Sequence, residues 1–75
     1  MKIKIKLMGM LKEKTPDGGE LDLESGATIA DVLTVLNIEG DSIQAFSVNG
    51  LIQRDQETKL NEDDELVVLP PVGGG

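Results

Sequence analysis

Cysteine and histidine are both missing from this chain of 75 residues. Without thiols, disulfides, thiolate metal sites and a nucleophilic cysteine are excluded. Without imidazole, the commonest general base and the usual nitrogen ligand of zinc are excluded as well. Carboxylates, hydroxyls and lysines are a poor catalytic inventory. We therefore expect a protein that is not an enzyme, with no metal site and no bound cofactor of its own.

Long apolar runs are also absent. No segment approaches the roughly 20 apolar residues of a membrane span, and the lysine-rich start is not followed by the apolar stretch of a signal peptide. We expect a soluble, cytoplasmic protein without a membrane partner. Acidic residues outnumber basic ones by 14 to 7, and the net charge of −7 disfavours nucleic acid and favours a basic protein partner.

The length allows one compact domain, too small to enclose a typical ligand cavity beside its own core. Residues 2–7 alternate between lysine and an apolar residue, the period of a half-buried strand. Asp17-Gly18-Gly19 predicts a turn and residues 20–24 a second strand. Between the first strand and this turn, residues 10–16 predict an enlarged loop or a single helical turn.

The pattern then changes to the helical period. Four apolar residues form one stripe: Ile29, Val32, Leu33 and Leu36. A helix should begin near Thr28, whose spacing to Asp31 predicts a capping box, and Asn37 and Gly40 mark its exit.

A second hairpin is predicted after the helix. Residues 43–48 are apolar and prone to form a strand, Asn49-Gly50 is a strong hairpin signal, and Leu51-Ile52 begins the returning strand. Residues 53–64 are polar and connective, and the acidic run 62–65 is interpreted as a solvated turn. Residues 66–69 are apolar at every position, which predicts a central strand covered on both faces.

This order of elements predicts an α+β fold, a ubiquitin-like β-grasp roll with a mixed sheet of four to five strands and one main helix packed on one face. In that fold the first and last strands are parallel neighbours in the middle of the sheet. Residues 1–69 are the expected domain and residues 70–75 a flexible glycine tail.

The tail has two interpretations. Terminal glycines are commonly no more than a frayed end. Here they follow Pro70-Pro71 directly off the predicted central strand, and two prolines aim a flexible tip in one direction. Residues 70–75 can reach roughly 20 Å, far enough to enter a partner's active site with the carboxylate foremost. Ordering three glycines costs on the order of 3–6 kcal/mol, so we expect the folded domain to contribute to binding.

That contribution is expected from the last strand. Either Val67 and Leu69 or Leu66 and Val68 face away from the helix, and Phe46 or Val48 from the neighbouring strand would extend the apolar surface. The alternative is that loops cover this face. The predicted partner-binding residues are Phe46, Val67, Leu69, Pro70, Pro71, Val72 and Gly73.

Two segments, Ser47-Val48-Asn49-Gly50 and residues 61–75 with their Pro-Pro-Val-x-Gly-Gly ending, resemble the MoaD/ThiS family of ubiquitin-like sulfur carriers. The ending is more similar to the small subunit of molybdopterin synthase than to the thiazole-pathway carrier. The resemblance implies that an ATP-dependent activating enzyme adenylates the Gly75 carboxylate and that a sulfur donor converts it to a thiocarboxylate. Gly74 matches the penultimate family glycine, and the molybdopterin synthase large subunit is the implied recipient of the tail.

Three other functions stay open at this point: a sulfur carrier for thiazole (thiamine) synthesis, a ubiquitin-like modifier conjugated to other proteins through Gly75, and a non-covalent β-grasp binding module with an incidental tail.

Overall fold

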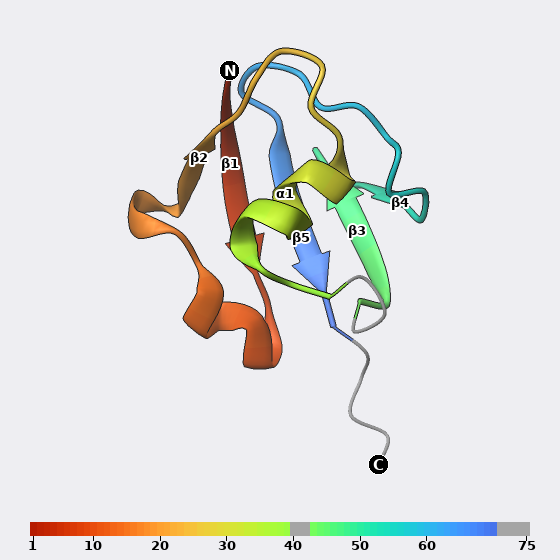
Figure 1. Cartoon of the computed structure of the whole chain (residues 1–75). Coiled ribbons are helices and arrows are strands. Elements are labelled where there is room, and N and C mark those ends of the chain that lie inside the picture. The colour runs from red at the N-terminus through yellow and green to blue at the C-terminus, as the bar shows by residue number, and fades with distance from the viewer. Residues whose placement is uncertain (40–42, 71–75) are drawn as a thin grey trace.

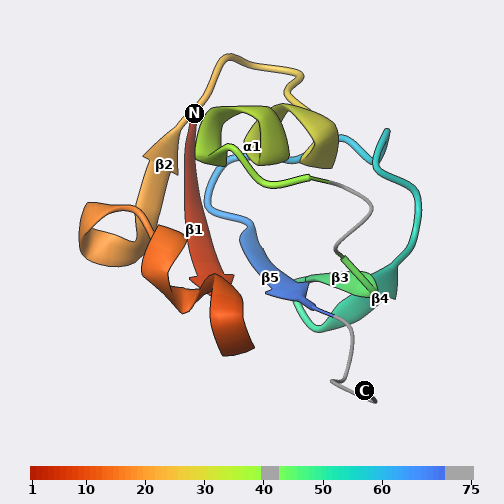
Figure 2. The ribbon, with the colours of Figure 1, turned by 60° about the horizontal axis from the view of Figure 1, so that its bottom comes forward.

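The computed structural model describes residues 1–39 and 43–70 of the chain. In these residues, five strands form one sheet in the order β2-β1-β5-β3-β4, and a single α-helix lies across one face of it (Figures 1 and 2). Strand β1 is Lys2–Leu7, β2 is Glu20–Asp22, β3 is Ala45–Val48, β4 is Leu51–Gln53 and β5 is Glu65–Leu69. The predicted β-grasp fold is confirmed.

The first and last strands are the parallel pair at the centre. Ile5 of β1 is in register with Leu66 of β5, whereas β2 and β3 run antiparallel on either side of this pair. Because parallel strands end at the same edge of a sheet, the chain after β1 and the chain after β5 leave the domain together. This edge is called the tail edge below.

Helix α1, Ile29–Leu36, begins and ends as the sequence predicts. The Thr28 hydroxyl accepts from the Asp31 amide while the Asp31 carboxylate accepts from the Thr28 amide, which is the predicted capping box. Asn37 closes the helix in the left-handed conformation, at φ 58°. Three stripe residues are buried and Leu36 is partly buried against the core.

Two short 3-10 helices join β1 to β2: η1, Gly9–Lys14, and η2, Asp17–Gly19. Of the two alternatives predicted for residues 10–16, an enlarged loop or a single helical turn, η1 corresponds to the helical turn. Gly18 and Gly19 both have positive φ, as the predicted reversal requires. Strand β2 is two residues shorter than predicted. Pairing continues to Leu23, whose amide donates to the Met1 carbonyl, but the Glu24 carbonyl already accepts from Ala27 in a turn.

The core lies between α1 and one face of the sheet. Its buried side chains are Ile3, Ile5, Leu7, Leu11, Ile29, Val32, Leu33, Ile38, Phe46, Leu60, Leu66 and Val68. The predicted coverage of the last strand on both faces is wrong. Leu66 and Val68 are fully buried but Val67 and Leu69 are only partly buried, because the one α-helix in the described part of the chain covers one side.

The polar connection after β4 is more ordered than its composition suggests. Its carbonyls at Gln56 and Thr58 accept from Ala30 and Ile29, the amides that the first turn of a helix leaves without intrahelical partners. Leu60 is buried at 2% exposure and its amide donates to Ala27. The connection therefore fixes the start of α1. In the described part of the chain, no helix is long and apolar enough to cross a membrane.

Candidate functional site

The end of β5 is held from both sides. The Val68 carbonyl accepts from the Met8 amide at 3.2 Å, and the Leu69 carbonyl accepts from the Gln44 amide at 2.8 Å. Hydrogen bonds to both neighbours continue to the last residue of the strand. The chain therefore leaves the sheet from a fixed point, and the residues that follow begin in a defined position.

Pro70 is the first residue beyond that point, and it lies against Gly9. A Cβ atom built on Gly9 would come within 3.1 Å of Pro70 Cγ, closer than an ordinary van der Waals contact. Gly9 also has a φ of 57°, which side chains disfavour. Since proline offers no amide hydrogen, the ladder stops here. The contact with η1 is possible because β1 and β5 end at the same edge.

The face of the sheet away from α1, called the open face below, carries a short apolar surface next to the tail edge. Val67 lies in register with Ser47 of β3, and Ser47 with Ile52 of β4, so these side chains form one row across three strands. Leu69 lies two residues further along β5, on the same face. Ile52 is 55% exposed. Of the two orientations left open by the sequence, the structure has Val67 and Leu69 outward.

Phe46 does not belong to this surface, so its prediction as a partner-binding residue is wrong. It lies in register with Val68, and both side chains point to the helix side of the sheet. Phe46 is 3% exposed and belongs to the core, and Val48 also packs against that core. The alternation of strand faces makes both residues part of the interior.

Among the predicted site residues, the structure thus brings Val67, Leu69 and Pro70 together at one edge. Pro71, Val72, Gly73, Gly74 and Gly75 lie outside the described residues. Two participants were missed: Ile52, whose position follows from a two-residue Asn49-Gly50 turn that pairs Ser47 with it, and Gly9, whose sequence context gives no sign of its contact with Pro70.

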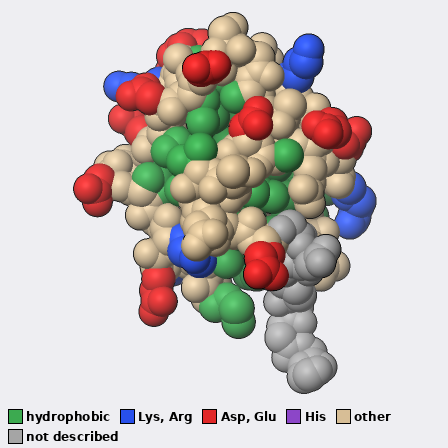
Figure 3. All heavy atoms as spheres, in the orientation of Figure 1, with side chains coloured by type: hydrophobic (Ala, Val, Ile, Leu, Met, Phe, Trp, Pro, Cys, Tyr) green, Lys and Arg blue, Asp and Glu red, His purple; other side chains and the backbone are tan. Residues whose placement is uncertain are grey.

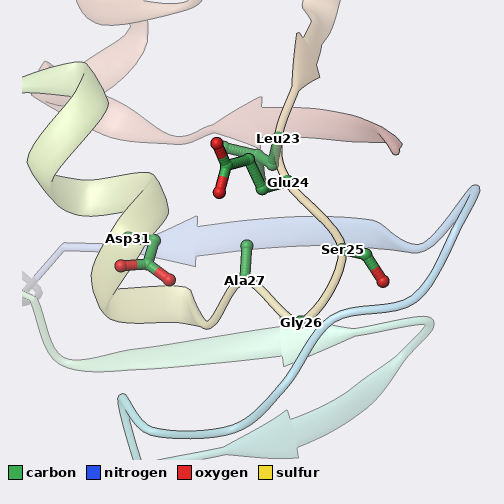
Figure 4. A pocket seen from close by; sticks show the side chains of 6 residues that line it. All are labelled: Leu23, Glu24, Ser25, Gly26, Ala27 and Asp31. Atoms are coloured by element: carbon green, nitrogen blue, oxygen red, sulfur yellow. The ribbon is translucent and has the colours of Figure 1, made fainter.

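Three hollows of the described surface are lined by residues other than Val67, Leu69 and Pro70. One of about 310 Å³ is lined by Leu23, Glu24, Ser25, Gly26, Ala27 and Asp31 (Figure 4). Its Asp31 carboxylate already accepts from Thr28 as the helix cap. The hollow follows β2, whose last residue Asp22 pairs with Lys2 at the start of β1. It is therefore at the opposite edge of the sheet from Pro70.

The acidic run 62–65 also lies at that opposite edge, and it is not wholly solvated as predicted. Asp64 is buried at 9% exposure, and its carboxylate accepts from the Asn49 side chain and the Asn61 amide, both at 2.8 Å. The Asn49 side-chain oxygen in turn accepts from the Glu65 amide at 2.9 Å. This network connects the β3–β4 turn to the start of β5. No cluster of three acidic side chains suited to a metal ion occurs in residues 1–39 and 43–70.

These features define a class of protein: a ubiquitin-like β-grasp domain whose central last strand leads directly into the C-terminal segment. Comparison with known proteins identifies the family. The sequence profile of the ThiS family matches residues 5–75, and the chain belongs to that family. It is a small ubiquitin-fold protein of the sulfur-carrier or modifier type, as the sequence resemblance predicts.

Solved structures agree with this fold. SAMP1 from Haloferax volcanii is 22% identical with a TM-score of 0.74, and the match covers 100% of both chains. The small archaeal modifier protein 1 from Methanosarcina acetivorans is 28% identical with a TM-score of 0.68, covering 99% of this chain and 96% of that one. A chain in the complex of subunits 1 and 2 of the molybdopterin-converting factor from Helicobacter pylori is 19% identical with a TM-score of 0.63, covering 100% of both. A search of curated protein sequences gave no match.

Proposed function

We propose that this chain is a cytoplasmic sulfur carrier and that the Gly75 carboxylate is its reactive group. A partner enzyme would adenylate that carboxylate with ATP and release pyrophosphate. Sulfur from a donor would then displace AMP and leave a thiocarboxylate. Adenylation is needed because a carboxylate has no leaving group of its own, whereas AMP leaves readily. The catalytic groups belong to the partner, and Gly74 gives its active site access to the terminal carbonyl.

The observation that carries the proposal is how Leu69 and Pro70 are held where the tail begins. Leu69 ends a central strand that is hydrogen-bonded on both sides, and Pro70 rests on Gly9 immediately beyond it. A domain that only displays its sheet does not need Leu69 and Pro70 to be held in this way. The lack of cysteine supports the same interpretation, because sulfur cannot be carried on a side-chain thiol.

We propose molybdopterin synthesis as the pathway that receives the sulfur. The Pro-Pro-Val-Gly-Gly-Gly ending supports this choice, and so does the fold similarity to a chain from a complex of two molybdopterin-converting factor subunits. The recipient would be the large subunit of a synthase. Residues 71–75 would enter its active site while Val67 and Leu69 contact its surface.

The test of the carrier chemistry is a mass measurement. The full chain is incubated with its cognate activating enzyme, ATP and a sulfur donor, and the intact mass is followed. We expect a gain equal to the exchange of one oxygen for sulfur, confined to the C-terminal peptide after proteolysis. A chain lacking Gly74 and Gly75 serves as control and should not change. An unchanged mass of the full chain, with an enzyme proven active on another carrier, would refute the proposal.

A modifier function is the second candidate, and the 28% identity to an archaeal modifier protein favours it. The same acyl adenylate could then react with lysine amines of other proteins. Cell extracts would contain peptides in which Gly75 is joined to a lysine side chain. Activity in cells that survives removal of Gly74 and Gly75 would instead leave only the non-covalent binding module.

A further inference from the structure

Most of the basic residues lie in one part of the chain. Five of the seven fall within residues 1–14, and Glu13 is the only acid in that segment. The segment is therefore strongly positive, whereas residues 15–75 contain the other 13 acids and only Arg54 and Lys59 as bases. The net charge of −7 hides this separation. A partner that approaches residues 1–14 meets a surface of opposite sign to the chain as a whole.

The fold places three of these lysines on the open face. Lys2, Lys4 and Lys6 alternate with the buried residues of β1, and all three are exposed. Lys2 and Lys4 have acidic neighbours: Asp22 and Glu20 lie opposite them on β2, and Glu65 lies opposite Lys4 on β5. These cross-strand pairs reduce the positive charge at the edge remote from the tail.

Lys6 is in a different position. Its register partner on β5 is Val67, the first residue of the row Val67–Ser47–Ile52, and it lies two register pairs nearer to the tail edge than Lys4. Strand β1 then leads into η1, which adds the exposed Lys12 and Lys14 and the 82% exposed Met10. Positive charge and apolar surface are thus adjacent where the tail begins. On the face that carries α1, acidic and basic side chains both lie around the rim (Figure 3).

We infer that the protein surface which receives the tail is acidic, with carboxylates placed opposite Lys6 and Lys12 around an apolar contact for Val67, Leu69 and Ile52. This inference rests on the proposed function for the identity of the partner, and it reverses the basic partner expected from net charge alone. Opposite charges at the rim would speed association and orient the domain so that the tail meets the active site. Nucleic acid fits less well, because an apolar row without aromatic rings offers no stacking surface and the rest of the chain repels phosphates.

The experiment compares two double variants of equal charge. Lys6→Gln/Lys12→Gln removes two positive charges next to the tail edge. Arg54→Gln/Lys59→Gln removes two exposed ones from the connection between β4 and β5. Affinity for the activating enzyme is measured by calorimetry at low and high salt, and adenylation by ATP–pyrophosphate exchange. We expect the first variant to bind about tenfold more weakly at low salt, with the difference shrinking at high salt, and the second to change less than about twofold.

Each outcome is decisive. Equal losses of affinity in the two variants, or no loss in either, would overturn the inference of an acidic partner surface. If the unchanged chain were still adenylated normally, the proposed function would remain supported. Lysine-dependent binding without pyrophosphate exchange would support the acidic surface and count against the carrier chemistry. No binding by the unchanged chain would count against both. Equally tight lysine-dependent binding to a labelled oligonucleotide would replace the protein partner with nucleic acid. Unchanged circular dichroism and melting temperature show that the variants are folded.

Discussion

The two faces of the sheet use the same kinds of residue for opposite purposes. On the helix side, Leu66 and Val68 are fully buried, whereas Val67 and Leu69 on the same strand are partly exposed on the open face. Hydrophobicity alone does not separate these pairs, because all four residues are aliphatic. Strand alternation and the position of α1 decide which side chains stabilise the fold and which remain available to a partner.

The largest expected effect comes from removing the aromatic ring on the buried side. Phe46→Ala should lower the free energy of unfolding by about 3–5 kcal/mol, because the ring is fully surrounded by the core and leaves a cavity. In so small a domain this is a large share of the total stability. The matched change on the open face is Ile52→Ala, which should cost less than about 1 kcal/mol, since Ile52 is 55% exposed.

Urea unfolding followed by circular dichroism measures both values. Comparable losses for the two variants would mean that the open face contributes to stability as much as the core does. Among protein that remains folded, Ile52→Ala should weaken binding to the activating enzyme more than Phe46→Ala does. Ile52→Ala should then weaken binding while leaving the fold intact.

Most of the fold could be predicted from local patterns. Alternation located β1, the 3.6-residue stripe and the Thr28–Asp31 spacing located α1, and Asn49-Gly50 located the second hairpin. The continuous apolar run of β5 was the exception. Such a run does not reveal whether one or both faces are covered, because that depends on how many elements pack on the sheet.

The orientation of β5 depends on Asn49, a residue of the β3–β4 turn whose side chain contacts the start of β5. The Asn49 carboxamide accepts from the Glu65 amide and donates to Asp64, and these bonds fix where β5 starts relative to β3. A slip by one residue would exchange Val67 and Val68 between the two faces. The hydrogen bonds of Asn49 therefore help to set the difference between the faces.

Asn49→Gly should be the second largest effect, with a loss of about 1–3 kcal/mol, because the buried Asp64 carboxylate loses a hydrogen-bond donor. Glycine is chosen because Asn49 has a φ of 52°, which glycine adopts without strain. Asn61→Gly is the control, since Asn61 reaches Asp64 through its backbone amide and keeps that bond. Equal shifts of the urea midpoint in the two variants would contradict the role of the Asn49 side chain.

The candidate site was less predictable than the fold. Val67 and Leu69 were predicted as one of two alternatives, and Pro70 was found from the tail motif. The prediction for Phe46 is wrong because the face on which its side chain lies depends on the register between β3 and β5. That register, in which residue 45 lies opposite residue 69, is not visible in the sequence. Gly9 was invisible, because its contact with Pro70 joins residues 61 positions apart at the end of two parallel strands.

That contact leads to a modest expected change in stability and a specific change in function. Gly9→Ala and Gly18→Ala each place a side chain at positive φ, 57° and 73°, and each should cost about 1–2 kcal/mol. They differ in surroundings. A Cβ on Gly18 has no atom within 4 Å, whereas a Cβ on Gly9 lies 3.1 Å from Pro70 Cγ, so Pro70 has to move.

We expect both variants to unfold at similar urea concentrations, and only Gly9→Ala to be adenylated severalfold more slowly. The reason is that a displaced Pro70 sends the carboxylate along a different path, and reaction rates are sensitive to small errors of position. Pyrophosphate exchange at saturating enzyme measures this step separately from docking on the open face. Equal adenylation rates for Gly9→Ala and Gly18→Ala would mean that the direction of the tail is set beyond Pro70, and that the open face alone brings the tail to the partner.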